Sequence, residues 1–493
     1  MHATRFAFAL CLLLAGGVQA RDYHVDSTAG NDSAPGTTPA QAWKSLEKVN
    51  ATEFTAGDRI LFKAGGRWSG QLHPKGSGRA NGPKVEPITI TRYGEGTLPR
   101  IDGEGKVPDT VLLENIQYWE VTDLEITNQG PETAPWRTGV RILADGIGTM
   151  NYIALRRLYV HDVNGDLRKS NEGCGIFFEA KGRGTFFDRL LIENCKVERT
   201  DRNGICQRGH GGPHSRSVII RGNTLDDIGG DGIKLWGTDG GLIEKNIVRK
   251  ARARAKDASA GIWPFDCNDT VIQFNEVSGT LGTLDGQGFD SDYACRRTLI
   301  QYNYSHDNEG GFILICGPGN SFNSDTIIRY NISVHDGVDS ARVFHFGGKS
   351  TNTRVYHNTI VLGPRQKVPV LLFTDWDKGF AEGATFTNNL VITSEGGKAL
   401  YKFGPDKGTT FEGNVFAGVH EGLPAGTAVS KTVPKLKGPL EPADGFASAE
   451  RFKPAATDRN FPRGNVIKDN GGRDFFGKPL RPTDRPAIGA AEP

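Results

Sequence analysis

The sequence has few of the features that mark helical, membrane-spanning or nucleic-acid-binding proteins. Its short β-branched segments have no helical pattern of about ten residues between them, which argues against an α/β fold. No segment after residue 20 approaches the ~18 uninterrupted apolar residues of a transmembrane helix. Lys and Arg number 59 against 57 Asp and Glu, so the net charge of +2 gives no general attraction to nucleic acid or to an anionic membrane. We therefore expect neither as a partner.

Cysteine is also scarce. Seven occur, and Cys11 lies in a predicted signal peptide, so six remain in the mature chain. None has CxxC spacing, which makes a zinc site unexpected. Cys267 and Cys295 follow Gly261 and Gly288 by six and seven residues, at nearly equivalent places in adjacent repeats. This spacing allows either a disulfide or two buried free thiols.

What the sequence does contain is an asparagine that recurs three residues after an Ile, Val or Phe. The positions are Asn223, Asn246, Asn275, Asn303, Asn331, Asn358, Asn389 and Asn414, separated by 23 to 31 residues. Such a period, with strand and turn residues only, indicates a solenoid. We predict an all-β fold, a parallel β-helix with coils ~4.8 Å apart. The asparagines should form a hydrogen-bonded ladder at a turn where a left-handed backbone suits Asn.

A second repeat places a small residue before a large apolar one. It reads Gly139-Val140, Gly175-Ile176, Gly204-Ile205, Gly232-Ile233, Gly261-Ile262, Gly288-Phe289 and Gly311-Phe312. If the apolar residue points into the solenoid, the next one points out, because side chains alternate along a strand. The outward positions then include Glu179, Arg208, Lys234, Trp236, Trp263, Phe265, Asp290, Asp292, Ile313 and Ile315, while Phe312 and Leu314 point inward. Such a mixture of aromatic and charged residues on one face is typical of a binding surface.

The chain divides into four predicted segments. Residues 1–20 read as a signal peptide, since Arg5 precedes an apolar run and Val18-Gln19-Ala20 fits a cleavage site. The protein is therefore expected to be secreted or periplasmic. Residues 21–86 form an N-terminal cap and first coils, with a strand at 23–26 and a short helix at 42–50. The β-helix occupies 87–418, and the irregular tail 419–493 packs along its outer wall.

Several of these segments resemble a known group of proteins. The Asp26-Ser27 to Asn31-Asp32 opening, the entry strand Gly57–Phe62, the coil segment Gln301–Glu309 and the Ile488-Gly489-Ala490 ending are similar to exported right-handed, single-stranded parallel β-helix proteins of the pectin-lyase-like superfamily. The resemblance covers nearly the whole mature chain. It implies a carbohydrate-active protein that acts on its long parallel sheet, as a glycoside hydrolase, a polysaccharide lyase or a uronan epimerase.

Carboxylates cluster in consecutive coils on that sheet. Asp290 and Asp292 lie two residues apart on one outward face, roughly 6.5 Å between Cα atoms. Glu309 lies one coil further on, within reach of the same pocket. Hydrolysis of a glycoside needs two such groups, one to protonate the leaving oxygen and one as nucleophile or base. We therefore predict Asp290, Asp292 and Glu309 as catalytic residues. The predicted substrate-binding residues are Glu179, Arg208, Lys234, Trp236, Trp263 and Phe265.

Other aspartates are better explained by the fold. Asp231, Asp285 and Asp307 lie at predicted turns, where Asp accepts backbone hydrogen bonds, and we interpret them as structural. The repeated His-Asp pairs are interpreted in the same way.

Two alternative functions stay open at this point. A lyase or epimerase would use Lys234 or Arg208 as base, with Ca²⁺ held by Asp290, Asp292 and Asp266. A non-catalytic glycan-binding solenoid would need the aromatic residues but no acid pair. The paired Trp residues and Glu309 favour a hydrolase, for which we expect no metal or cofactor. It would act as a monomer on a polysaccharide or oligosaccharide.

Overall fold

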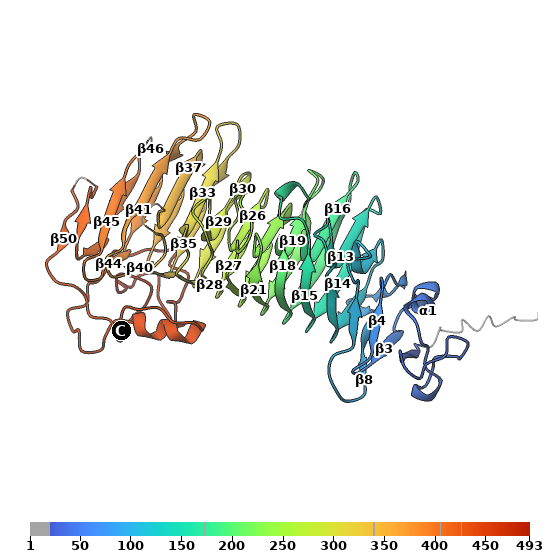
Figure 1. Ribbon diagram of the computed structural model, residues 1–493. Coiled ribbons are helices and arrows are strands. Elements are labelled where there is room, and N and C mark those ends of the chain that lie inside the picture. Colours follow the sequence, from blue (N-terminus) through green and yellow to red (C-terminus); the bar gives the residue numbers. More distant parts are fainter. Residues whose placement is uncertain (1–19, 172, 339–340, 405, 425) are drawn as a thin grey trace, which may run out of the picture.

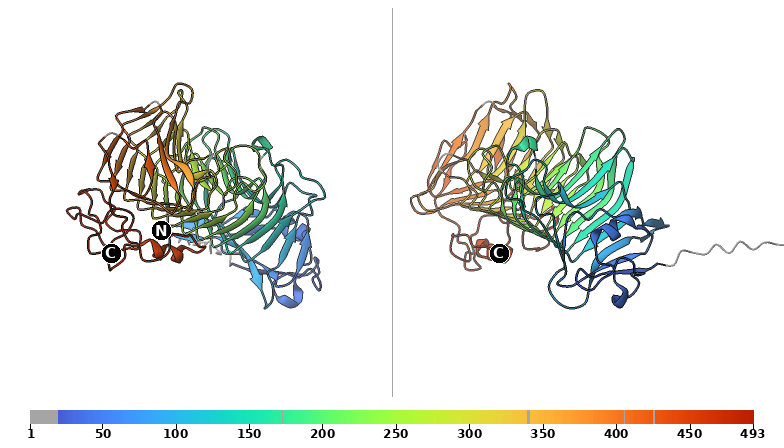
Figure 2. Two further views of the ribbon diagram at one scale, coloured as in Figure 1. Left: turned by 60° about the vertical axis from the view of Figure 1, so that its left-hand side comes forward. Right: turned by 45° about the vertical axis from the view of Figure 1, so that its right-hand side comes forward.

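The computed structural model describes residues 20–171, 173–338, 341–404, 406–424 and 426–493. The predicted signal peptide lies almost entirely outside them. The described chain winds into a parallel β-helix with three long faces (Figures 1 and 2). Within these residues the faces are parallel sheets of 15, 12 and 14 strands, and each coil contributes one strand to each sheet along most of the solenoid. The predicted all-β, parallel β-helical fold is confirmed.

The 12-stranded sheet, called the site sheet below, carries the residues that the sequence singled out. In spatial order its strands are β10 (Asp109–Glu114), β13 (Thr138–Asp145), β16 (Cys174–Lys181), β19 (Asn203–Arg208), β22 (Ile233–Trp236), β26 (Ile262–Phe265), β29 (Gln287–Ser291), β33 (Gly311–Gly317), β37 (Phe344–Gly348), β41 (Lys367–Thr374), β45 (Lys398–Lys402) and β49 (His420–Glu421).

The other two faces are equally regular. The 15-stranded sheet runs from β1 (Asp22–Val25) to β47 (Thr410–Glu412), and the 14-stranded sheet runs from β4 (Arg67–Ser69) to β50 (Val429–Ser430). Parallel stacking already begins where β1 pairs with β3 (Arg59–Lys63), so the first coils precede residue 87.

The predicted asparagine ladder runs unbroken from Asn223 to Asn414. At Asn303, the side-chain amide donates to Oδ1 of Asn331 at 3.0 Å and to the carbonyl of Ile272 at 2.9 Å. Its own Oδ1 accepts from the backbone and the side chain of Asn275. The same bonds recur from coil to coil, so the asparagines satisfy backbone groups buried at the turn.

One detail of this turn differs from the prediction. The left-handed residue is the one before each asparagine, for example Lys245 with φ 57° and Tyr302 with φ 56°. The asparagine itself continues into the next strand with its side chain buried. A buried amide that bonds to the coils on both sides needs this inward orientation, and the preceding residue makes the turn.

The inward column of the site sheet is also confirmed along five coils. Ile176, Ile205, Ile233, Ile262 and Phe289 pair in register, and all are fully buried in the main core. The glycines before them are tightly enclosed. A Cβ on Gly232 would lie 2.4 Å from the carbonyl oxygen of Gly261, so the stacked coils leave no space for a larger residue.

In the next coil the prediction is confirmed for Phe312, which is buried in the core, but it is wrong for Ile313, Leu314 and Ile315. Phe289 pairs with Ile313 instead of Phe312, so Ile313 and Ile315 point into the core, and Leu314 lines the outer face. The backbone amides of Phe312 and Ile313 both donate to the carbonyl of Val343, which is the hydrogen-bond pattern of a β-bulge. A slip of one residue exchanges the two faces of a strand.

The N-terminal segment covers one end of the solenoid core, and the C-terminal tail packs along its outer wall. Helix α1 (Leu46–Ala51) begins later than predicted because Ser45 is its N-cap and accepts a hydrogen bond from the Lys48 amide. Trp43 instead lies in a bridge to Val25, although its ring is buried as expected. The C-terminal tail lies against the outer wall, and its short 3-10 helix η3 (Phe446–Phe452) buries Phe452 among side chains of the solenoid.

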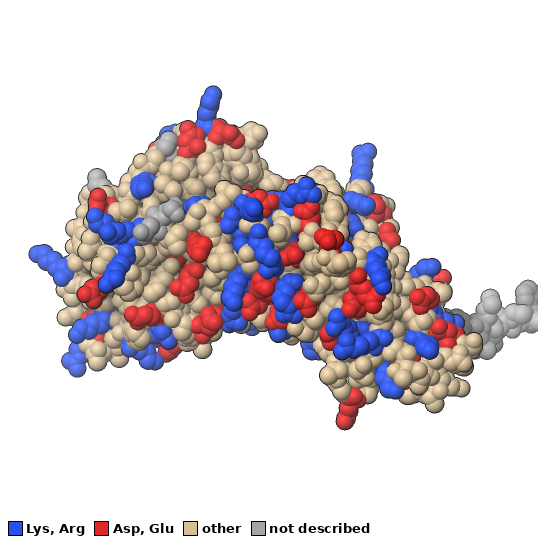
Figure 3. All heavy atoms as spheres, in the orientation of Figure 1, with Lys and Arg blue, Asp and Glu red and all other residues tan. Residues whose placement is uncertain are grey.

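Cys267 and Cys295 are buried thiols and do not form a disulfide. Figure 3 shows Lys and Arg interspersed with Asp and Glu over the visible face, without a large area of one sign. Many of these charges pair across coils, as in the 2.7 Å contact of Arg157 with Asp123. In the part of the chain described here, no helix has the length and apolar character needed to cross a membrane.

Candidate active site

A cavity of about 560 Å³ opens on the outer face of the site sheet. Strands β22, β26, β29 and β33 form its floor, and the loops that follow or precede strands of the site sheet form its walls. The lining residues are Lys169, Ser170, Arg208, Lys234, Trp236, Ala258, Trp263, Phe265, Leu284, Asp285, Asp290, Asp292, Tyr293, Leu314, Cys316 and Trp376. The site therefore combines aromatic walls with a group of acids.

Two carboxylates and a thiol meet in the cavity floor. One oxygen each of Asp290 and Asp292 and the Sγ of Cys316 lie within 4.8 Å of one another. The Cys316 thiol donates to Oδ1 of Asp292 at 3.1 Å, and the Tyr293 amide donates to the same oxygen at 2.7 Å. The parallel register brings this group together, because Cys316 follows Leu314, the partner of Asp290 on β33, by two residues.

Burial and mutual repulsion raise the pKa values of this pair. Desolvation is the main cause for Asp290, whose side chain is almost fully buried, and the charges of Asp292 and Asp285 add to it. Desolvation also raises the pKa of Asp292, to about 6, although its hydrogen bonds from Cys316 and Tyr293 oppose the shift. Asp292 accepts hydrogen bonds from Tyr293 and Cys316 that favour its ionised form, so we expect a proton shared by the pair to lie on Asp290.

A third carboxylate lies in the same cavity. Asp285 has the left-handed backbone of a turn residue, with φ 60°, in agreement with its interpretation from the sequence as a turn residue. Its side chain nevertheless lines the cavity, and desolvation raises its pKa while the charges of Lys169 and Arg342 lower it. Asp285 therefore serves the turn and the site together.

Aromatic rings and cations form the opposite side of the cavity. The Lys234 ammonium lies 5.5 Å from the ring centre of Trp263 and 5.9 Å from that of Trp236. The Arg208 guanidinium lies over Trp236, and Phe265 meets Trp236 edge-on at 5.0 Å. Cation–π contacts of this kind hold both ring and cation in place. The half-buried rings of Trp236 and Phe265 are suited to the apolar faces of sugars, whereas Trp263 is buried at the cavity lining.

Buried charges behind the floor fix one of these rings. The Trp263 indole nitrogen donates to Oδ1 of Asp231 at 3.1 Å, and the Arg202 guanidinium lies 3.4 Å from Oδ2 of the same carboxylate. Arg202 and Asp231 are both fully buried. Arg202 also reaches Asp257 at 3.1 Å, whose other oxygen accepts from the Lys169 amide. This network anchors the loop that brings Lys169 to the cavity.

The structure brings together most of the residues predicted from the sequence. Asp290, Asp292, Arg208, Lys234, Trp236, Trp263 and Phe265 all line the cavity. Glu309 is not among its lining residues, and its carboxylate instead accepts a hydrogen bond from the Gly282 amide. Glu179 is also outside the lining. It is buried and bound to Arg141 at 2.6 Å and to His210 at 2.7 Å, and these contacts lower its pKa against the effect of burial.

Other lining residues were not singled out by the sequence. Cys316 and Leu314 were hidden by the one-residue slip in β33. Lys169 and Trp376 come from loops whose position depends on packing between distant coils, so no periodic signal marks them. Trp376 packs on the site sheet, edge-on to His345 at 5.4 Å and against the backbone of Gly347.

Comparison with known proteins agrees with this architecture. Residues 174–360 match the family model described as a right handed beta helix region. The matched segment contains most of the cavity. The described fold is thus a right-handed parallel β-helix, as the resemblance to pectin-lyase-like proteins implied.

Two lacto-N-biosidases are similar to this chain in sequence. A lacto-N-biosidase from Bifidobacterium longum subsp. longum is 26% identical over 95% of this chain and 36% of its own length. The crystal structure of a GH136 lacto-N-biosidase from Eubacterium ramulus is 28% identical, with a TM-score of 0.59, over 68% of this chain and 64% of that one. The chain therefore spans about a third of the curated relative and under two thirds of the crystallised one.

A further solved structure supports the fold alone. XylC, in complex with xylose, is 14% identical with a TM-score of 0.55, over 95% of this chain and 98% of that one.

Proposed function

We propose that this protein is a glycoside hydrolase that cleaves oligosaccharides or polysaccharides in the cavity of the site sheet. The observation that carries the proposal is the pair of buried Asp290 and half-buried Asp292, with one oxygen of each within 4.8 Å and both pKa values raised. Similarity to two lacto-N-biosidases supports the same chemistry. The segment 1–20 supports a secreted or periplasmic location.

Retention of configuration is part of this proposal, because one oxygen of Asp290 lies within 4.8 Å of one oxygen of Asp292. Retaining glycosidases hold their carboxyl groups ~5–5.5 Å apart, whereas inverting enzymes leave ~6.5–9.5 Å for a water molecule. Asp290, the more buried of the two, would protonate the glycosidic oxygen as the bond to the anomeric carbon breaks. Asp292 would attack that carbon and form a covalent glycosyl ester. Water, deprotonated by Asp290, would then attack the same carbon and release the sugar and the Asp292 carboxylate.

The substrate is expected to be bound by stacking and by charge-assisted hydrogen bonds. Trp236, Trp263 and Phe265 offer ring surface, and Arg208 and Lys234 offer donors to sugar hydroxyl or amide oxygens. The relatives make lacto-N-biosides the first substrates to test on this chain.

A calcium-dependent lyase finds less support in these residues. Ca²⁺ takes six to eight oxygen ligands, whereas the cavity group consists of two carboxylates and a thiol. The donor set therefore does not fit calcium.

The test is product analysis on lacto-N-biosides and on a panel of polysaccharides, with and without EDTA. We expect new reducing ends, no absorbance of unsaturated uronate, and no effect of EDTA. Calcium-dependent absorbance that is lost in Lys234→Ala would replace the hydrolase by a lyase. Sugar binding without any product, unchanged in Asp290→Asn, would indicate a binding protein.

The pH dependence of the reaction should follow Asp292. Its raised pKa, about 6, belongs to a group that must be ionised to act as nucleophile, so kcat/KM should fall as the pH drops below about 6. Because the Cys316 thiol lowers this pKa, Cys316→Ala should move the acid limb to higher pH. Cys206→Ala, at a buried thiol away from the cavity lining, is the matched control. An acid limb that stays in place in Cys316→Ala would remove Asp292 as the titrating group.

A further inference from the structure

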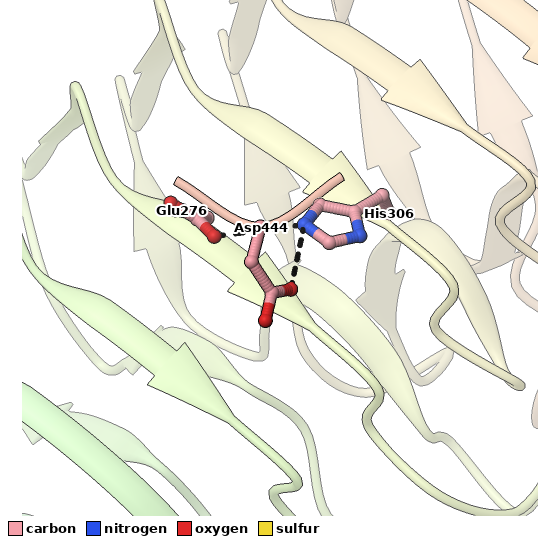
Figure 4. Close-up of side chains that lie close together, drawn as sticks. All are labelled: Glu276, His306 and Asp444. Atoms are coloured by element: carbon pink, nitrogen blue, oxygen red, sulfur yellow. Dashed lines mark ion pairs between the residues drawn. The ribbon is translucent and has the colours of Figure 1, made fainter. Parts of the chain in front are cut away.

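We propose that Glu276, His306 and Asp444 form a binding site for a divalent transition-metal ion, for which Zn²⁺ fits best. The bound ion would link the C-terminal tail to the solenoid. The three side chains come from different parts of the fold (Figure 4). Glu276 begins β28 (Glu276–Ser278), His306 ends β32 (Tyr304–His306) in the next coil, and Asp444 lies in the tail just before η3.

The geometry of the three groups is close to that of a metal site. Nε2 of His306 lies 3.6 Å from Oε1 of Glu276 and 3.9 Å from Oδ1 of Asp444, and the three atoms lie within 4.8 Å of one another. Ligands at ~2.1 Å from a tetrahedral zinc ion are about 3.4 Å apart. A shift of the exposed Asp444 would bring the group to that spacing.

Two buried atoms in this cluster lack hydrogen-bond partners. His306 is 2% exposed and Glu276 is 0% exposed, yet Nε2 of the histidine and Oε2 of the glutamate make no hydrogen bond. Buried polar atoms without partners are costly and call for an explanation. Figure 4 shows the imidazole Nε2 directed between the two carboxylates. A cation there would give this nitrogen a partner.

The other imidazole nitrogen is arranged as in known metal sites. Nδ1 of His306 lies 2.9 Å from Oδ2 of Asp307. Metal-binding histidines usually donate their second ring N–H to a carboxylate, which fixes the tautomer and directs the free lone pair at the metal. One imidazole and two carboxylates suit zinc or a similar transition ion better than Ca²⁺ or Mg²⁺, which prefer oxygen ligands alone.

Arg249 and a proton are the competitors for this site. Arg249 lies 3.7 Å from Glu276 and 3.7 Å from Asp444, too far for a hydrogen bond. The Gly445 amide of the tail donates to Oε1 of Glu276 at 2.8 Å, which leaves one lone pair of this oxygen for a metal ion. Burial lowers the pKa of His306, but the hydrogen bond with Asp307 and the nearby Glu276 carboxylate, whose Oε1 lies 3.6 Å from Nε2, outweigh this effect and raise the value to about 9. Metal binding must displace that proton, and an ion-pair clamp without metal is the rival explanation.

An earlier coil contains the same arrangement of Glu, His and Asp side chains, but there the described tail contributes no carboxylate. In an earlier coil His161 pairs with Asp162 at 2.6 Å through Nδ1 and with Glu125 through Nε2. Glu125 pairs in register with Tyr159, just as Glu276 pairs with Tyr304. There Nε2 makes a 3.2 Å contact with Glu125 and needs no further partner. In the later coil the contact between His306 Nε2 and Glu276 Oε1 is longer, 3.6 Å, and this is the coil where the tail contributes Asp444.

The test is the metal content and thermal stability of the full chain after EDTA treatment, dialysis and exposure to Zn²⁺. We expect about one zinc per chain after gel filtration and a rise in Tm of a few degrees. Asp444→Asn and His306→Gln should both lose the zinc and the rise in Tm. The controls are Asp469→Asn, which removes another tail carboxylate bound to Arg329 and Arg354, and His161→Gln.

Each outcome decides the proposal. Zinc retained in Asp444→Asn and His306→Gln would place it elsewhere on the surface and overturn the site. Absence of bound zinc in the native chain would leave only the ion-pair clamp. Substitution with Co²⁺ gives an independent readout, since a visible spectrum that is lost in His306→Gln requires imidazole coordination. None of these measurements depends on enzyme activity.

Discussion

Replacing Asp292 with alanine should lower kcat/KM by about 1,000-fold or more, because the variant loses the group proposed to form the covalent intermediate. Asp290→Ala should cause a loss of about 100- to 10,000-fold, the range for removal of a general acid. Activated substrates with good leaving groups should recover much of the second loss but little of the first. Steady-state kinetics on both kinds of substrate measures this difference.

Azide provides a direct test of the two roles. In Asp292→Ala an azide ion can occupy the space of the lost carboxylate and attack the anomeric carbon, which should give a glycosyl azide of inverted configuration. In Asp290→Ala it should attack the glycosyl ester on Asp292 and give a glycosyl azide of retained configuration. Exchange of these two products would reverse the assignment of acid and nucleophile.

Asp285→Asn is the third member of this series. Asp285 lines the same cavity, and its charge raises the pKa values of both Asp290 and Asp292. If it acts only on its neighbours, the variant should retain most of kcat while the pH profile moves to lower pH. A loss as large as that of Asp292→Ala, with azide rescue in Asp285→Gly, would place the nucleophile at Asp285.

The parts of the site that could be predicted follow from local periodicity. Alternation along a strand places Lys234 and Trp236 on the same face, and the repeat of small and apolar residues aligns Lys234 with Trp263 on the next coil. Both signals need only neighbouring residues and a constant period. The ladder from Asn223 to Asn414 could be predicted for the same reason.

The parts that could not be predicted depend on contacts between distant segments. Phe312 takes the place of the glycine of earlier coils, and the bulge beside it turns Cys316 toward Asp292, which no repeat indicates. The loop with Lys169 is held by Asp257, 88 residues away in the chain. For Glu309 the prediction was wrong. Glu309 lies close to Asp290 and Asp292 in the sequence and was therefore predicted to reach the same pocket, but its carboxylate accepts a hydrogen bond from the Gly282 amide in a turn.

The asparagine ladder leads to the largest expected effect on stability. Asn303→Ala should destabilise the protein by about 3–5 kcal/mol, because each buried polar group left without a partner costs about 1–3 kcal/mol. The variant removes the acceptor for the Asn275 amide and side chain, and it removes the donor to the Ile272 carbonyl. None of these groups can reach water, since Asn303 and its neighbours in the ladder are fully buried.

Asn414 provides the matched control at the end of the same ladder. It makes the same kind of bonds, accepting from Asn389 and donating to the Phe386 carbonyl, but it is only partly buried. Water can replace its bonds, so Asn414→Ala should cost about 1 kcal/mol. Equilibrium denaturation of both variants, followed by circular dichroism, measures the difference. The two positions differ mainly in their access to water. An equal loss of stability in Asn303→Ala and Asn414→Ala would therefore contradict the idea that burial makes the ladder stabilising.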